Sequence, residues 1–101
     1  MEVLSDSTFD KARKGNAVLD FYADWCGPCR MFAPTFEATS KKVSNVKFFK
    51  VDTEQAQNVS IEFSVRSIPT VVFLKEGKEV HREIGVLSSA DFEKVLKRTF
   101  G

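Results

Sequence analysis

One segment in the first quarter of the chain limits the possible folds more than any other. Residues 17–23 read Ala-Val-Leu-Asp-Phe-Tyr-Ala, so apolar side chains fall on both alternating faces of a strand. A strand with two apolar faces is stable only when other elements cover it on both sides. The segment therefore predicts a central strand in a sheet with helices on both faces, and it leaves the acid Asp20 in the core.

The remaining patterns alternate between strands and helices. Strand patterns cover residues 3–4, 46–51, 70–74 and 79–84. Helical spacing begins after Ser7, after Trp25 and after Ser88, and a weaker helical stretch covers about residues 54–63. The expected order is β-α-β-α-β-α-β-β-α, an α/β fold whose mixed central sheet of about five strands is flanked by four helices. Neither a repeat nor a linker interrupts residues 1–101, so we expect a single domain.

Local signals predict where several of these elements begin and end. Ser7 is placed to cap the first helix, and Gly15 to stop it. Pro34 should kink the second helix without ending it, because the helical spacing continues beyond it. The four residues around Gly77 suit an antiparallel hairpin in which this glycine takes a positive φ. Ser88 is expected to cap the last helix.

Composition and charge exclude several classes of function. The 101 residues carry 15 basic and 14 acidic side chains, and the net charge of +1 gives no basis for binding nucleic acid or an anionic membrane. The longest apolar run covers residues 71–74, far short of the roughly 18 residues of a membrane span. The N-terminus is acidic where a secretion signal needs a basic start, so we expect a cytoplasmic protein.

The two cysteines, Cys26 and Cys29, lie where the central strand gives way to a helix. Residues three apart on a helix have Cβ atoms about 5 to 6 Å apart, and a disulfide needs about 3.5 to 4.5 Å, so a modest adjustment lets the thiols bond reversibly. The helix N-terminus favours a thiolate at Cys26, which makes it the nucleophile. Cys29 lies a turn further in, so we expect it to resolve the mixed disulfide that Cys26 forms.

Several short motifs together resemble the thioredoxin family. They are Trp-Cys-Gly-Pro-Cys at residues 25–29, the strand segment at residues 18–24, Pro34, Lys50, Ser-Ile-Pro-Thr at residues 67–70, and Gly85. The resemblance extends over essentially the whole chain, and its motifs are far more specific than a lone CxxC. It implies the thioredoxin fold, the reduction of protein disulfides by a dithiol/disulfide cycle, and no bound cofactor beyond the redox-active disulfide.

The resemblance also implies partners. The chain has no dinucleotide-binding motif, so we expect its electrons from a separate thioredoxin reductase, a flavoprotein that usually uses NADPH. The expected acceptors are disulfide-containing proteins such as ribonucleotide reductase, peroxiredoxin or methionine sulfoxide reductase. No additional apolar stripe stands out in the sequence, so a monomer is expected.

Residues away from the cysteines gain roles from the resemblance. Asp20 resembles the buried acid that assists proton transfer at the resolving cysteine, and Lys50 resembles its partner. Sequence alone allows equally well a hydrogen-bonded, purely structural acid. The Ile68–Pro69 bond is expected to be cis, and the backbone of Ile68 and Thr70 to pair with an extended substrate segment.

The expected docking surface is flat and apolar and surrounds the nucleophile. Its members are Trp25, Gly27, Pro28, Gly85 and Val86. Tyr22 departs from the family, which often has a second Trp at this position. Tyr keeps a ring and a hydrogen-bonding tip, so we expect the packing near the site to survive.

Other interpretations of the cysteines fit the sequence less well. A structural zinc site needs four ligands, whereas the chain offers two cysteines and one histidine, His81, which is expected to face solvent in the hairpin. A Cys-His hydrolase would need His81 beside Cys26, and no motif brings them together. Two alternatives stay open: a disulfide oxidant or isomerase on the same fold, and a binding subunit whose redox chemistry is incidental.

We predict that Asp20→Asn leaves the fold intact and slows disulfide exchange near neutral pH, because an amide cannot accept the proton of the resolving thiol. The measurement is the rate of reduction of a protein disulfide between about pH 6 and pH 9. Kinetics unchanged over this range would contradict a proton-transfer role for Asp20.

Overall fold

The computed structural model describes residues 1–101 and contains five strands. They are β1 (Val3–Leu4), β2 (Asn16–Tyr22), β3 (Lys47–Asp52), β4 (Thr70–Lys75) and β5 (Lys78–Ile84). One sheet holds them in the order β1-β3-β2-β4-β5. β3 is parallel to both β1 and β2, whereas β4 is antiparallel to β2 and β5 is antiparallel to β4. The sheet is therefore mixed, as predicted, and β2 lies at its centre.

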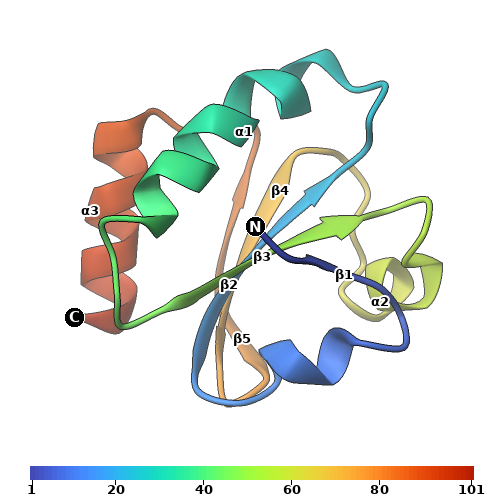
Figure 1. The fold of residues 1–101 in the computed structure, drawn as a ribbon, viewed down its shortest axis with the longest axis horizontal. Helices are drawn as coiled ribbons and strands as arrows, with labels where there is room; N and C mark the ends of the chain where they lie inside the picture. Colours follow the sequence, from blue (N-terminus) through green and yellow to red (C-terminus); the bar gives the residue numbers. More distant parts are fainter.

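Helices cover both faces of this sheet. They are the 3₁₀ helix η1 (Phe9–Ala12) and the α-helices α1 (Gly27–Ser40), α2 (Gln57–Glu62) and α3 (Ser89–Phe100). Figure 1 shows α1 and α3 together on one side of the sheet, and α2 and η1 on the other. The predicted arrangement of layers is thus confirmed. None of the helices has the length and apolar character needed to cross a membrane.

Alternation along β2 supplies two separate apolar cores. Leu19 and Phe21 belong to the core that includes Phe9 of η1. Val18 belongs to the opposite core, beneath α1 and α3. Because successive side chains of a strand point to opposite faces, Asp20 lies on the α1 side with Val18. Burial of β2 on both faces confirms the prediction from its sequence.

Phe92 of α3 lies at the centre of the core on the α1 side. Its ring packs against four others, with centroids 5.5 to 6.3 Å away: Phe32, Phe36, Phe48 and Phe73. These rings come from α1, β3 and β4, so one side chain connects both helices to the sheet. Aromatic pairs at this spacing stabilise a core beyond the effect of burial. The cluster holds α1, and with it the cysteines at its start, against the sheet.

The prediction for the first helix is wrong in type and in cap. The helix is a four-residue 3₁₀ helix, and the Ser7 hydroxyl bonds to that of Ser5 instead of capping it. The neighbouring Asp6 acts at a distance, because its carboxylate accepts the backbone N–H groups of Asn58 and Val59 at the start of α2. Polar side chains of the N-terminal segment therefore form hydrogen bonds that cannot be predicted from local spacing.

The other helices follow the sequence more closely. α1 continues past Pro34, as predicted, and ends at Ser40. α3 begins as predicted, since the Ser88 hydroxyl accepts the backbone N–H of Asp91. α2 is shorter than predicted because the chain before it forms a turn, in which Ala56 donates to the carbonyl of Asp52.

The hairpin between β4 and β5 is tighter than predicted. Its loop is the pair Glu76–Gly77 rather than four residues, and both have positive φ, 48° and 82°. Turns with two positive φ values match the twist of paired strands. A Cβ on Gly77 would also lie 3.1 Å from the carbonyl oxygen of Arg13, so this position has two reasons to be glycine.

His81 on β5 differs from the prediction that it faces solvent. Its ring packs against Phe73 of β4, with centroids 5.3 Å apart. Its Nε2 lies 2.5 Å from the carboxylate of Glu83. The half-buried histidine covers the edge of the aromatic cluster, because Phe73 is its cross-strand partner.

We predict that Phe92→Ala lowers the free energy of unfolding by about 3 to 5 kcal/mol, because it removes a fully buried ring from the middle of the cluster. Urea denaturation followed by circular dichroism measures the change. Phe100→Ala is the matched control: that ring lies at the end of the same helix, is partly buried and packs on the ring of Phe73 alone. Equal losses in the two variants would contradict the central position of Phe92.

Candidate functional site

The cysteine pair lies at the N-terminus of α1, directly after the central strand. Cys26 is the residue that caps the helix, and its Sγ accepts the backbone N–H of Cys29 at 3.2 Å. The two cysteines form a disulfide, with Cα atoms 5.2 Å apart. Gly27 and Pro28 occupy the first helical turn, where the missing N–H of proline costs no helical hydrogen bond. The structure thus places the predicted pair as its spacing required.

The surroundings of Cys26 favour a sulfur that carries negative charge. An N-capping atom accepts one of the unpaired N–H groups of the first turn, and the helix dipole is positive at this end. Both effects stabilise a thiolate more than a thiol. Cys29 is the third residue of the helix, and its Sγ accepts no backbone N–H group, so it lacks the capping hydrogen bond. In exposure the two residues hardly differ, since both are buried in the disulfide form.

A loop from the far side of the sheet lies against the cysteines. The Ile68–Pro69 peptide bond is cis, as expected from the family resemblance. The carbonyl oxygen of Ile68 lies 3.8 Å from Sγ of Cys26. Gly85, with a φ of 96°, donates its backbone N–H to the carbonyl of Pro69 at 2.9 Å. Segments far apart in the sequence therefore meet at the nucleophile.

The two backbones expected to pair with a substrate differ in their surroundings. Thr70 is the first residue of β4 and has strand partners on both sides, Phe21 and Ile84. Its hydroxyl donates to the carbonyl of Ser67 at 2.6 Å. Ile68 precedes the strand and lies outside this ladder. The backbone of Ile68 therefore has no strand partner, whereas that of Thr70 is already paired on both sides.

Exposed apolar side chains lie on the elements around the cysteines. Trp25 is 67% exposed and Val86 is 47% exposed, in agreement with a docking surface. Ile84 and Met31 are also exposed, at 67% and 71%, and the sequence analysis did not assign them to this surface. Met31 lies one helical turn after Gly27 and directly before Phe32 of the buried stripe. Its place one residue off that stripe could have indicated from the sequence that it is exposed.

Trp25 has a partner that the sequence did not indicate. Its indole Nε1–H donates to the carboxylate of Glu54, which lies in the turn before α2. The ring keeps two-thirds of its surface exposed and yet has one fixed hydrogen bond. No local spacing relates positions 29 apart, so only the fold brings them together.

Asp20 lies in the interior beneath α1 without a hydrogen bond. It pairs in register with Lys50 of β3 and Val71 of β4, and it is fully buried. Neither carboxyl oxygen has a hydrogen-bond partner in the protein. Burial raises the pKa of Asp20 from 3.8 to about 7, and the charge of Lys50 opposes this rise in part. This environment differs from that of a structural, hydrogen-bonded acid, which was the other interpretation of Asp20.

Lys50 and the resolving cysteine share a small cavity. Its volume is about 130 Å³, and its lining includes Cys29, Lys50, Tyr22 and Arg30. Its lining is mixed, with apolar side chains beside the charged Asp24, Arg30 and Lys50, and the space has room for water. Lys50 forms no hydrogen bond with Asp20, and its Nζ lies instead over the ring of Tyr22, 4.3 Å from the centroid. The strand register makes Asp20 and Lys50 neighbours, as the sequence predicted. Their charged groups nevertheless form no ion pair.

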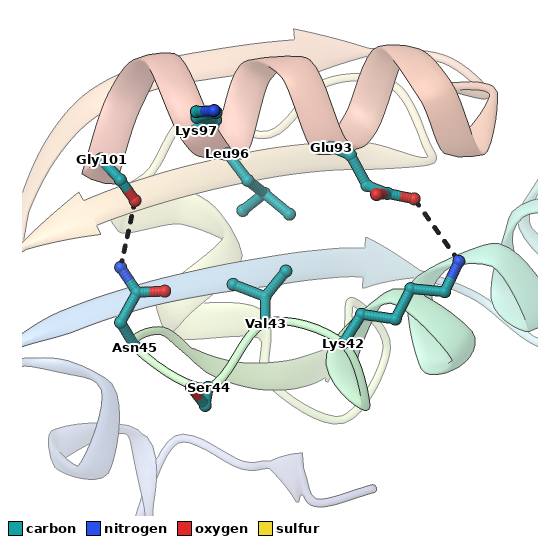
Figure 2. A pocket seen from close by; sticks show the side chains of 8 residues that line it. All are labelled: Lys42, Val43, Ser44, Asn45, Glu93, Leu96, Lys97 and Gly101. Carbon is teal, nitrogen blue, oxygen red and sulfur yellow. Dashed lines mark hydrogen bonds and ion pairs between the residues drawn. The ribbon is translucent and has the colours of Figure 1, made fainter.

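A larger surface hollow lies far from this chemistry. Figure 2 shows it between α3 and the segment after α1, with Val43 and Leu96 pointing into it. It has a volume of about 350 Å³, and two contacts close its ends, Lys42 with Glu93 and Asn45 with Gly101. The cysteines lie at the opposite end of α1, so the thiol chemistry does not use this hollow. No group of three or more His, Cys, Asp or Glu residues is placed to hold a metal ion.

Comparisons with known proteins agree with this site. A sequence model described as Thioredoxin matches residues 1–98. The chain is 43% identical to a thioredoxin of Borreliella burgdorferi over 84% of this chain and 74% of that one. It is 35% identical to a thioredoxin of Chlamydia trachomatis over 97% of each chain.

Solved structures give the same result. The structure is similar to a thioredoxin of Fasciola hepatica, with a TM-score of 0.87 and 40% identity over 97% of this chain and 98% of that one. It is also similar to a thioredoxin of Plasmodium falciparum, with a TM-score of 0.90 and 27% identity over 98% and 99% of the two chains.

The raised pKa of Asp20 predicts how stability depends on pH. Between pH 3.8 and about 7 the folded protein holds a proton that the unfolded chain has lost, so stability falls as the pH rises through this window. We predict that Asp20→Asn removes this fall. Relative to the wild type, the variant gains up to about 4 kcal/mol on going from about pH 3 to pH 8.

Urea denaturation at each pH measures this difference. Asp10→Asn is the matched control, because Asp10 is exposed and bonds only to Arg13. Stability curves that run parallel for the wild type and Asp20→Asn would show that the proton on Asp20 is not coupled to folding.

Proposed function

The chain belongs to the thioredoxin family, and we propose that Cys26 performs the nucleophilic step of its thiol–disulfide reductase activity, with Cys29 as the resolving thiol. The activity is that of the family, and the chain holds the cysteine pair that carries it. One observation supports the assignment of roles most strongly. The N–H of Cys29 is donated to Sγ of Cys26, so the charge of a thiolate is stabilised more at Cys26 than at Cys29.

The proposed cycle balances in sulfur and electrons. The Cys26 thiolate attacks one sulfur of a substrate disulfide, and the other substrate sulfur leaves as a thiolate. Cys29 then attacks Sγ of Cys26, which forms the Cys26–Cys29 disulfide and releases the second substrate sulfur. Two electrons pass to the substrate, and the pair ends in the oxidised form that the structure shows.

Asp20 is the proposed base of the resolving step. The Cys29 thiol must lose a proton before it attacks, and a general base works best when its pKa is near the working pH. Burial brings the pKa of Asp20 to about 7. Asp20 has no hydrogen-bond partner in the protein, and the cavity beside Cys29 and Lys50 has room for water, which supports transfer through solvent rather than by direct contact. Lys50 stabilises the charge that Asp20 gains.

Substrates are proposed to dock as extended segments beside Ile68. Strand addition uses backbone hydrogen bonds for affinity and apolar contacts for the side chains. The unpaired position of Ile68 supports the first, and the exposed Trp25, Ile84, Val86 and Met31 support the second. Gly27, Pro28, Pro69, Thr70 and Gly85 shape this surface without large side chains of their own.

The proposed partners follow from family membership. Thioredoxins are re-reduced by thioredoxin reductase and act on disulfide-containing proteins, and their redox group is the cysteine pair itself. We propose ribonucleotide reductase, peroxiredoxin and methionine sulfoxide reductase as acceptors. We further propose that residues 1–101 work as one monomeric domain in the cytoplasm, where thiols stay reduced. An oxidant, an isomerase or a redox-incidental subunit is not favoured by these relatives.

The roles of the two cysteines predict opposite behaviour of two serine variants. With a disulfide-containing protein, Cys29→Ser should accumulate a mixed disulfide through Cys26, because no thiol remains to resolve it. Cys26→Ser should accumulate none, because the less activated Cys29 does not attack the substrate. Non-reducing electrophoresis and intact-mass spectrometry measure the adducts. Adducts formed mainly by Cys26→Ser would reverse the assignment.

A further inference from the structure

Lys50 takes its position from an aromatic ring rather than from a carboxylate. Its Nζ lies 4.3 Å from the centre of the Tyr22 ring, within the range of a cation–π contact. Tyr22 follows Asp20 by two residues on β2, so the two side chains share a face of the sheet, and Lys50 is the register partner of Asp20. The three residues form one row at the junction of β2 and β3.

No other group holds the ammonium. Lys50 Nζ takes part in no hydrogen bond to a side chain and in no ion pair within 4 Å, and its aromatic contact is with the ring of Tyr22. A lysine side chain has four rotatable bonds and a strongly hydrated head, so without a contact it extends into water. The ring therefore decides whether the charge stays near the cavity beside Cys29.

The surroundings of Tyr22 explain why an aromatic side chain suits this position. Burial, and after it the negative charges of Asp52, Asp24 and Asp20, raise the pKa of the Tyr22 phenol, so the ring is uncharged at working pH. An uncharged ring attracts a cation through its face and does not neutralise it. A carboxylate in the same place would pair with Lys50 and cancel the charge that reaches Asp20.

Arg30, the other cation at the cavity, is held elsewhere. Its guanidinium donates to the backbone carbonyl of Asp24 at 2.8 Å. Lys50 is also the only charged partner that affects the pKa of Asp20, whose oxygens lack hydrogen bonds. The field at the Asp20 carboxyl thus depends on where one ammonium lies.

We propose that Tyr22 is a positioning residue whose ring holds the Lys50 ammonium beside the cavity at Cys29 and so sets the field at the Asp20 carboxyl. The inference rests on the proposed role of Asp20 for its effect on turnover, but its electrostatic part does not. Trp at this position presents the same kind of face to the cation, whereas an aliphatic side chain presents none.

The test measures the protonation of Asp20 directly, by carbon-13 NMR of its carboxyl group in the reduced protein over a pH series. Tyr22→Phe and Tyr22→Trp keep a ring, so they should leave the pKa of Asp20 close to the wild-type value. Tyr22→Leu removes the ring and releases Lys50. Because the cation lowers the pKa of Asp20, its release should raise that pKa by about half a unit or more. An unchanged value in Tyr22→Leu overturns the proposal.

A cycle with Lys50 separates the ring from the cation. Lys50→Met should raise the pKa of Asp20 at least as much as Tyr22→Leu does, and Tyr22→Leu added to Lys50→Met should change it little further. Equal and additive shifts would mean that the ring acts without the lysine, which also overturns the proposal. Tyr22→Met, flexible and without a ring, replaces Tyr22→Leu if that variant fails to fold.

The pH profile of disulfide reduction distinguishes this inference from the proposed function. If the pKa of Asp20 rises in Tyr22→Leu and the profile moves with it, both stand. If the pKa rises and the profile does not move, Tyr22 positions Lys50 but Asp20 is not the base. If the pKa does not rise, the positioning role of Tyr22 fails whatever the profile shows.

Discussion

Burial of β2 on both faces is the constraint on which the rest of this structure depends. A strand that is apolar on both sides needs a layer of helices above and below it, and α1 with α3 forms one layer while α2 with η1 forms the other (Figure 1). Because α1 follows β2 directly, its N-terminus lies at the edge of the sheet where β2 ends. The cysteines stand at this junction, and the aromatic cluster around Phe92 keeps α1 in place beneath them.

The same burial creates the chemical asymmetry of the site. Cys26 is at the helix terminus, where backbone N–H groups stabilise negative charge, while Asp20 is in the interior, where the absence of such groups makes negative charge unfavourable. Negative charge is thus favoured at the first position and disfavoured at the second. A thiol pair that must exchange protons as well as electrons near neutral pH benefits from both. The carboxyl without a partner lowers stability, which is a common feature of functional sites.

The protonation of Asp20 depends on neighbouring residues of two parallel strands, β2 and β3. The register sets Lys50 beside Asp20, but the ring of Tyr22 decides how the ammonium is held. A direct ion pair would keep the carboxyl charged and of little use as a base. Because the Asp20 carboxyl has no hydrogen-bond partner and the Lys50 ammonium lies over the ring of Tyr22, the proton of Asp20 stays exchangeable. The substitution of Tyr for a common Trp is consistent with this arrangement, since both present an aromatic face.

What the sequence by itself determined about this protein is local or periodic. The double-faced strand, the Cys26–Cys29 spacing at a helix start, the Ser88 cap and the glycine of the hairpin are all recognisable because their partners lie within a few residues. The tertiary structure alone decided that Asp6 caps α2, that His81 covers Phe73, that Glu54 binds Trp25, and that Lys50 turns to Tyr22 rather than to Asp20. The partners of these side chains are distant in the sequence. Each contact forms because the packed layers bring the two surfaces within a few ångströms, and no local pattern records this.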